Sequence, residues 1–167
     1  MTRSIAWQGG GNGSSPASTD TGRVADILER ELDATIHEWM QLVEKEPDLS
    51  RIRLNFEERT GHLPRLLHDV IARLRLDKGL EAPVSVAASH HGELRRKQGY
   101  TAAMVVDESR ILQVSIFSTL HRNEHLVKFS TLLPDVVTIA DEVDAQLKQQ
   151  ILCFLPGEHD GKKEAKK

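Results

Sequence analysis

The segment 89–99, which reads SHHGELRRKQG, holds the densest group of residues that could do chemistry. His91 and Arg95 are four residues apart, so they would share one face of a helix. Further along, Glu108 interrupts a run of apolar residues, where a carboxylate without a partner would be costly to bury. We therefore predict a polar clasp in which Arg95 forms an ion pair with Glu108. His91 would lie on the same side, and Gly92 would let the two helices approach closely.

Two interpretations of this clasp stay open at the level of sequence. Buried ion pairs are more often structural than catalytic, so one interpretation is a polar contact that holds two helices in register. The other is functional, because His91 followed by Glu93–Arg96 is faintly similar to a kinase phosphoacceptor box, and nearby cations would suit a phosphoryl group. Gly92 interrupts that box, and the proline that should follow is absent. A histidine phosphotransfer protein with His91 as phosphoacceptor is kept as the alternative function.

Metal and haem chemistry have weaker support in the sequence. Residues 121–125 read HRNEH, the H-x-x-E-H arrangement of some zinc enzymes. Patterns of five residues recur by chance, and eight histidines make this more frequent, so we expect a polar turn there. A haem would need an axial histidine in an apolar pocket, and His62, His68, His90 and His91 are available, but we expect surface or capping roles for them. We predict no metal site, no cofactor and no enzymatic activity.

Helical periodicity fills the chain between its two ends. Apolar residues recur at three- and four-residue spacing, and no stretch alternates polar and apolar residues as a strand would. Proline and glycine mark the limits: Pro47 ends the first helix, Pro64 suits the first turn of the second, and Gly79 ends it. The expected helices cover residues 21–46, 63–78, 83–98, 102–120 and 134–154, with a short turn of helix at 54–59. The predicted fold class is all-α, a single bundle of five or six helices.

Composition narrows the classes of protein further. With 167 residues and 39% hydrophobic content the chain can fill one core, and we divide it into a flexible Gly/Ser-rich tail at 1–20, a helical domain at 21–155 and a flexible charged tail at 156–167. A net charge of −3 argues against a nucleic-acid binder. Cys153 is the only cysteine, which excludes an intramolecular disulfide and cysteine-based zinc sites. No apolar run is long enough for a transmembrane helix or a secretory signal, so we expect a cytoplasmic protein without membrane insertion.

Two stretches resemble a known family. The pattern HGxxRxxQGY at 91–100, followed by MVVDESRIL at 104–112, is similar to the N-terminal domain of the RsbT co-antagonist proteins, the RsbRD_N family. The stretch ERTGHLPRLL at 58–67 resembles that family's second-helix signature, and the likeness spans about residues 22–155. It implies a globin-like, haem-free helical module that senses or scaffolds, usually ahead of a STAS domain, a histidine kinase or a helix-turn-helix regulator. The motif positions that it singles out here are His91, Gly92, Arg95, Gly99, Tyr100 and Glu108.

This resemblance leads to a functional expectation. The domain would be a non-catalytic sensor or scaffold in bacterial signal transduction, of the stress-response kind. It would regulate a separate output partner: a kinase, a STAS or anti-sigma-type protein, or a transcriptional regulator. Only a dozen residues follow the last expected helix, so the output domain belongs to a separate partner or the sequence is a fragment of a longer protein. We also predict a homodimer, formed through the apolar stripe that runs from Val24 to Val43 on the N-terminal helix.

Overall fold

The described part of the chain folds into helices and connecting turns. The computed structural model describes residues 23–76, 80 and 83–155, and within those ranges it holds no strand. The elements are α1 (Val24–Arg30), α2 (Leu32–Val43), α3 (Pro47–Arg51), α4 (Phe56–Thr60), α5 (Leu63–Arg75), α6 (Val86–Lys97), α7 (Ala102–Arg122), the 3₁₀ turn η1 (Glu124–Leu126) and α8 (Phe129–Phe154). The prediction of an all-α fold is confirmed. The tails expected at 1–20 and 156–167 lie outside the described residues.

The single N-terminal helix expected at 21–46 is two helices. α1 ends at Arg30 and α2 begins at Leu32, with Glu31 between them at φ −96° and ψ 15°. The hydroxyl of Thr35 donates a 2.9 Å hydrogen bond to the carbonyl oxygen of Glu31, four residues back. Such a bond competes with the hydrogen bonds of the helix backbone and bends helices. The bend lets both halves bury apolar side chains in the same core.

Several other limits differ from those expected: α5, for example, ends at Arg75, and Gly79, which we expected to end it, lies outside the described residues. α6 begins three residues later, because the Ser85 hydroxyl caps it by accepting a 3.0 Å hydrogen bond from an amide of its first turn. α8 begins at Phe129, so that Pro134 lies inside the helix instead of at its start. A short helix, α3, starts at Pro47, which we expected only to end the preceding helix. Proline is well tolerated in the first turn of a helix, where its missing N–H has no partner to lose.

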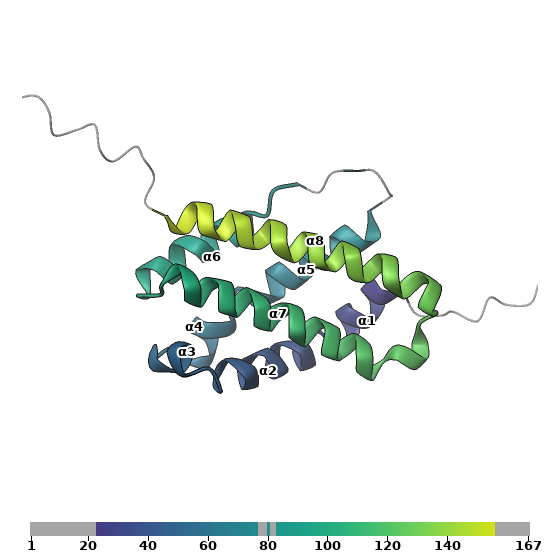
Figure 1. The fold of residues 1–167 in the computed structure, drawn as a ribbon, viewed down its shortest axis with the longest axis horizontal. Coiled ribbons are helices and arrows are strands. Elements are labelled where there is room, and N and C mark those ends of the chain that lie inside the picture. The colour runs from purple at the N-terminus through teal and green to yellow at the C-terminus, as the bar shows by residue number, and fades with distance from the viewer. Residues whose placement is uncertain (1–22, 77–79, 81–82, 156–167) are drawn as a thin grey trace, which may run out of the picture.

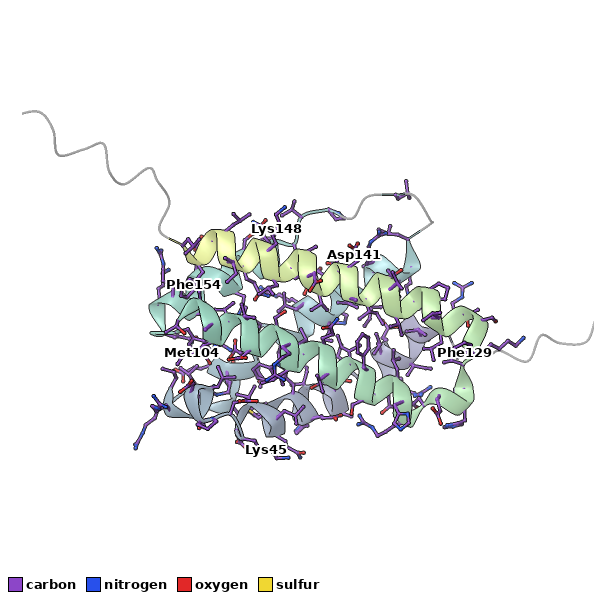
Figure 2. The ribbon with its side chains drawn as sticks, in the orientation of Figure 1. Lys45, Met104, Phe129, Asp141, Lys148 and Phe154 are labelled. Atoms are coloured by element: carbon purple, nitrogen blue, oxygen red, sulfur yellow. The ribbon has the colours of Figure 1, made fainter. Side chains whose placement is uncertain are left out.

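Two long helices run along the molecule in Figure 1. α7 and α8 lie side by side and are joined through η1, with α2 packed against α7. α1 packs against α5, and α6 makes its most extensive contact with α8. Side chains fill the space between these helices (Figure 2). No helix in the described ranges is long and apolar enough to cross a bilayer.

One apolar core joins α1, α2, α5, α7 and α8, and Leu49 of α3 and Ala88 of α6 also belong to it. Its largest fully buried side chains include Leu28 of α1, Trp39 of α2, Leu66 of α5, Ile116 of α7 and Ile139 of α8. The core therefore holds both halves of the sequence in one domain.

The stripe from Val24 to Val43 belongs to this core. Val24, Ile27, Trp39 and Val43 are each at most 1% exposed. Side chains that are buried within their own chain cannot also form the interface between two chains. The predicted dimer surface is therefore wrong, because the core of one chain uses the whole length of the stripe.

Candidate functional site

The predicted ion pair between Arg95 and Glu108 is present. The two side chains come from α6 and α7, and Nε of Arg95 lies 2.8 Å from Oε2 of Glu108. The side chains are 0% and 3% exposed, so solvent screens the pair very little. Burial alone would raise the pKa of Glu108, but the hydrogen bond with His91 and the charge of Arg95 outweigh it and lower that pKa. Glu108 is thus held as a carboxylate.

Both carboxylate oxygens of Glu108 have partners. Oε2 accepts from Arg95 and also lies 3.4 Å from Nε2 of His91. Oε1 accepts a 2.8 Å hydrogen bond from the Tyr100 hydroxyl, whose own pKa is raised by burial and by the charge of the carboxylate. The backbone carbonyl of Glu108 accepts a 3.1 Å bond from Nε1 of Trp39 on α2. With this many donors around it, the residue is fixed in position.

Arg95 ties α6 to α4 as well as to α7. Its Nη1 donates to the side-chain oxygen of Gln98 at 2.6 Å and to the carbonyl of Glu58 at 3.3 Å. Its Nη2 donates to the carbonyl of Arg59 at 2.7 Å. Glu58 and Arg59 belong to the C-terminal part of α4, where carbonyl oxygens without helical partners favour a cation. The guanidinium also lies 4.8 Å from the centre of the Tyr100 ring.

A second buried arginine, Arg59, makes the cluster positive. Arg59 is 4% exposed, and it donates to the Tyr100 hydroxyl at 3.0 Å and to the carbonyl of Ile52. Arg59 and Arg95 together carry two positive charges against the one negative charge of Glu108. Backbone carbonyls and the Gln98 amide oxygen, rather than a second acid, accept the remaining guanidinium hydrogens.

Two stacked histidines extend the cluster towards α5. The ring of His62, just before α5, stacks on that of His91 with centres 3.7 Å apart and an interplanar angle of 14°. Trp39 meets His62 in a T-shaped contact at 6.1 Å. Burial lowers the pKa of both imidazoles, and the charge of Arg95 adds to the effect, while Glu108 opposes it at His91. Both rings are therefore neutral near pH 7, and Nδ1 of each is buried without a hydrogen-bond partner among the described residues.

The end of α6 turns sharply and brings Tyr100 into the cluster. Gly99 has φ +82°, in the left-handed region that favours glycine. The Tyr100 amide donates to the carbonyl of Arg95 at 3.0 Å, and the Gly99 amide donates to the carbonyl of Arg96 at 3.1 Å. This pair of bonds is a Schellman motif, which ends the helix and reverses the chain. Gly99 thus positions Tyr100 without touching Glu108 itself.

Gly92 permits a close helix contact, but with α8 instead of α7. A Cβ atom at this position would lie 2.1 Å from the carbonyl oxygen of Gln150, so any side chain would push α6 and α8 apart. The prediction that Gly92 serves the approach to the helix of Glu108 is therefore wrong. Consecutive residues of a helix point about 100° apart, so that His91 can face Glu108 on α7 while Gly92 faces α8.

The cluster holds three groups that could offer ligands to a metal ion. Donor atoms of His62, His91 and Glu108 lie within 4.8 Å of one another. Because the two rings are stacked, however, their in-plane nitrogen lone pairs lie in nearly parallel planes and do not converge on one ion. Oε2 of Glu108 also already accepts a hydrogen bond from Arg95. Ring centres only 3.7 Å apart also leave no room for a porphyrin between the rings. This arrangement suits packing better than metal or haem coordination.

Residues 121–125 form the polar turn that we expected. The side chains of His121 and Glu124 are 80% and 65% exposed, and Nδ1 of the first lies 3.3 Å from Oε2 of the second. α7 ends at Arg122, and His125 belongs to η1. Two histidines at this spacing need one continuous helix to face a common ion, and here they lie on different elements.

The sequence alone does not assign Arg59, His62 and Trp39 to the cluster. Arg59 and His62 fall in the stretch 58–67, which the sequence singles out without a role for its polar residues. Trp39 fits the apolar stripe of its helix, so its indole N–H gives no separate signal.

In comparisons with known proteins, no family profile, curated protein or solved structure matches this chain. The geometry therefore carries the functional argument. It defines an all-helical domain in which one buried polar cluster joins α2, α4, α6 and α7.

Proposed function

We propose that this chain is a non-catalytic sensor or scaffold domain of bacterial signal transduction, globin-like and of the RsbRD_N type. It would act in the cytoplasm, in a stress response, by regulating a separate output partner. That partner would be a kinase, a STAS or anti-sigma-type protein, or a transcriptional regulator. The sequence resemblance suggests this role, and the buried polar cluster is the observation that supports it most.

The cluster supports a sensor because it gives the bundle a preferred helix arrangement. Arg95 contacts α4 through two backbone carbonyls and α7 through Glu108. A small slide of α6 would break several of these bonds together and leave buried charges unpaired. A ligand or partner that favours one arrangement over the other could then shift the balance between the two. A domain of this kind needs no catalytic group of its own.

The burial of His91 favours this role over a phosphotransfer protein. His91 is 2% exposed, and its Nε2 lies 3.4 Å from the Glu108 carboxylate. An incoming phosphoryl group would meet that negative charge, and a phosphodonor would have to open the helix contact to reach the ring. His91 therefore makes a better internal partner than an acceptor.

A homodimer remains part of the proposal, but it needs a surface other than the buried stripe of α1 and α2. Light scattering on the purified chain at tens of micromolar tests it. We expect twice the mass of one chain. A single-chain mass at these concentrations would contradict the dimer.

The test of the proposed function is co-purification of tagged full-length chain from the organism that carries the gene. We expect a signalling protein of one of the named classes to bind, and its measured activity to change when Glu108→Gln replaces the wild type. The control Asp107→Asn alters an exposed neighbour on the same helix and should behave as wild type. The absence of any such partner, or acid-labile phosphate on His91 after incubation with phosphoramidate, would overturn the proposal.

A further inference from the structure

A hollow of about 390 Å³ opens next to the polar cluster, between the turn that joins α4 to α5 and the outer face of α6. This volume is within the range of small-molecule sites in proteins. All of its lining residues belong to the described ranges. The hollow is therefore a candidate ligand site rather than a gap at the edge of the described chain.

Two lining residues of the hollow contact the cluster through their side chains, and Glu58 contacts it through its backbone carbonyl. His62 stacks on His91 with ring centres 3.7 Å apart. Gln98 accepts the 2.6 Å hydrogen bond from Nη1 of Arg95. A molecule in the hollow that displaced either side chain would disturb a partner of Glu108, since both His91 and Arg95 lie against that carboxylate.

His62 is the side chain best suited to respond. Its ring is held by stacking on His91 and by the T-shaped contact with Trp39, and its Nδ1 is buried with no hydrogen-bond partner in the described part of the chain. A buried polar atom without a partner is costly, so a ligand that forms a hydrogen bond with this nitrogen after a small rotation of the ring would recover that cost.

The charges around the hollow indicate the chemistry of the ligand. Glu57 and Arg65 line it with side chains that form no ion pair among the described residues. Oε2 of Glu58, also in the lining, accepts a 2.8 Å hydrogen bond from the Asn55 amide, and the Glu58 carboxylate adds a second negative charge at this end. Carboxylates at Glu57 and Glu58 and a guanidinium at Arg65, which has no ion-pair partner in the described part of the chain, together suit a molecule that carries an ammonium and a carboxylate group.

The apolar part of the lining limits the rest of the ligand. Ala87 and Leu94 of α6 supply aliphatic surface, and both are half-buried. A compact aliphatic group would cover this surface and exclude water from it.

We propose that the hollow binds a small zwitterion of amino-acid size, and that His62 and Gln98 transmit its binding to the Arg95–Glu108 pair. The ammonium would lie at Glu57 and the carboxylate at Arg65. This inference rests on the proposed function, because it identifies the input site of the sensor.

The test uses the fluorescence of Trp39, which contacts both His62 and Glu108. Trp7 and Trp39 are the two tryptophans of the chain, so Trp7→Phe isolates the signal. Each of the twenty L-amino acids is titrated into the full-length chain near pH 7. We expect at least one with an aliphatic side chain to change the emission in a saturable way. Its N-acetyl and amide derivatives, each lacking one of the two charges, should fail to do so.

Matched variants locate the site. Arg65→Gln and Glu57→Gln should each weaken binding by about tenfold or more, as expected for the loss of a hydrogen bond between charged groups. Arg96→Gln removes an exposed charge of α6 outside the lining and should stay within about twofold of wild type. If neither Arg65→Gln nor Glu57→Gln weakens binding, or if no amino acid binds at millimolar concentration by calorimetry, the site is refuted.

A further variant tests the transmission to the cluster. Glu108→Gln does not touch the hollow, but linkage requires its affinity for the amino acid to change if binding and the clasp are coupled. Unchanged affinity in Glu108→Gln, together with unchanged Trp39 emission on binding, would refute the coupling. If no amino acid binds but a signalling partner is still captured, the input site is refuted and the proposed function is not. Binding of an amino acid in the hollow, with no signalling partner captured, would keep the input site and remove the proposed function.

Discussion

The described part of the chain contains two buried carboxylates, and their surroundings have opposite effects on their pKa values. Glu108 on α7 is 3% exposed and Glu142 on α8 is 6% exposed. Glu108 faces a guanidinium and a tyrosine hydroxyl, and its pKa is lowered. Burial raises the pKa of Glu142, and the nearby charge of Asp69 adds to this, while the 3.1 Å hydrogen bond that Glu142 accepts from Gln146 opposes it. The two carboxylates are thus buried to a similar extent, but their pKa values are shifted in opposite directions.

The difference shows that the partners of a buried acid, rather than its depth, decide its charge. Glu108 is an ion around which four helices are arranged, so it should be expensive to disturb. The surroundings of Glu142 make its charged form less favourable than it is in the unfolded chain, so its charge should not stabilise the fold. The following changes test this contrast from the largest expected effect to the smallest.

Removal of the cation should be the most damaging change. Arg95→Ala leaves Glu108 buried with its charge uncompensated and frees the α4 carbonyls that Arg95 holds. We expect a loss of about 3 kcal/mol of unfolding free energy in urea titrations. The control Arg96→Ala changes the exposed neighbour on the same helix and should cost less than about 0.5 kcal/mol. Equal urea midpoints for the two variants would show that the ion pair does not stabilise the fold.

Neutralising Glu108 should cost less than removing Arg95. Glu108→Gln keeps one acceptor oxygen, but both carboxylate oxygens accept hydrogen bonds, so one of the donors Arg95 and Tyr100 loses its partner. We expect about 2 kcal/mol of destabilisation by chemical unfolding. If Glu108→Gln is destabilised at least as much as Arg95→Ala, the negative charge of Glu108 contributes more to stability than the positive charge of Arg95 does.

Acidification should destabilise the protein through the histidine stack. The pKa values of His62 and His91 lie below the ordinary value of 6.5, so the unfolded chain takes up protons first as the pH falls. The stability due to the neutral rings is fully present above pH 6.5 and is lost as the pH falls below it. Each ring should contribute up to about 1.4 kcal/mol per pH unit in that range. Glu108, with its lowered pKa, acts in the same direction at still lower pH.

Two variants check that the stack is responsible. His62→Phe keeps an aromatic ring against His91 and Trp39 but cannot titrate. A plot of its unfolding free energy against pH, from 7.5 to 5.5, should therefore have a smaller slope than that of wild type. His121→Gln removes an exposed histidine and should retain the full wild-type slope. An unchanged slope in His62→Phe would contradict the assignment.

The fold class was predictable because helical periodicity depends on local spacing. The limits of the helices were less so, since each depends on a contact that the sequence pattern does not display. The bend at Glu31 coincides with the hydrogen bond of the Thr35 hydroxyl, and the start of α6 coincides with the Ser85 cap. Pro47 can end one helix or begin the next, and the sequence does not distinguish the two.

Part of the site could be predicted for a similar reason. An acid inside an apolar run must find a cation, and the four-residue spacing of His91 and Arg95 supplies one nearby. The His62 stack could not be predicted, because it depends on how α5 and α6 meet in space. The partner of Gly92 was misassigned because a glycine that permits close packing does not indicate which neighbouring helix it packs against.

The smallest expected effect is at Glu142, where the contrast predicts a change of opposite sign. A raised pKa means that the stability due to Glu142 is present at low pH and is lost as the pH rises through the folded value. Glu142→Gln removes this penalty, and the amide oxygen can still accept the bond from Gln146. We expect the variant to be as stable as wild type at pH 5 and more stable by up to about 1 kcal/mol at pH 8, measured by urea unfolding at both values. Asp141→Asn, on the neighbouring exposed position, should shift both values by less than half as much. If Glu142→Gln is instead destabilised at pH 8, Glu142 is a charge that the fold needs, and the two buried acids are alike after all.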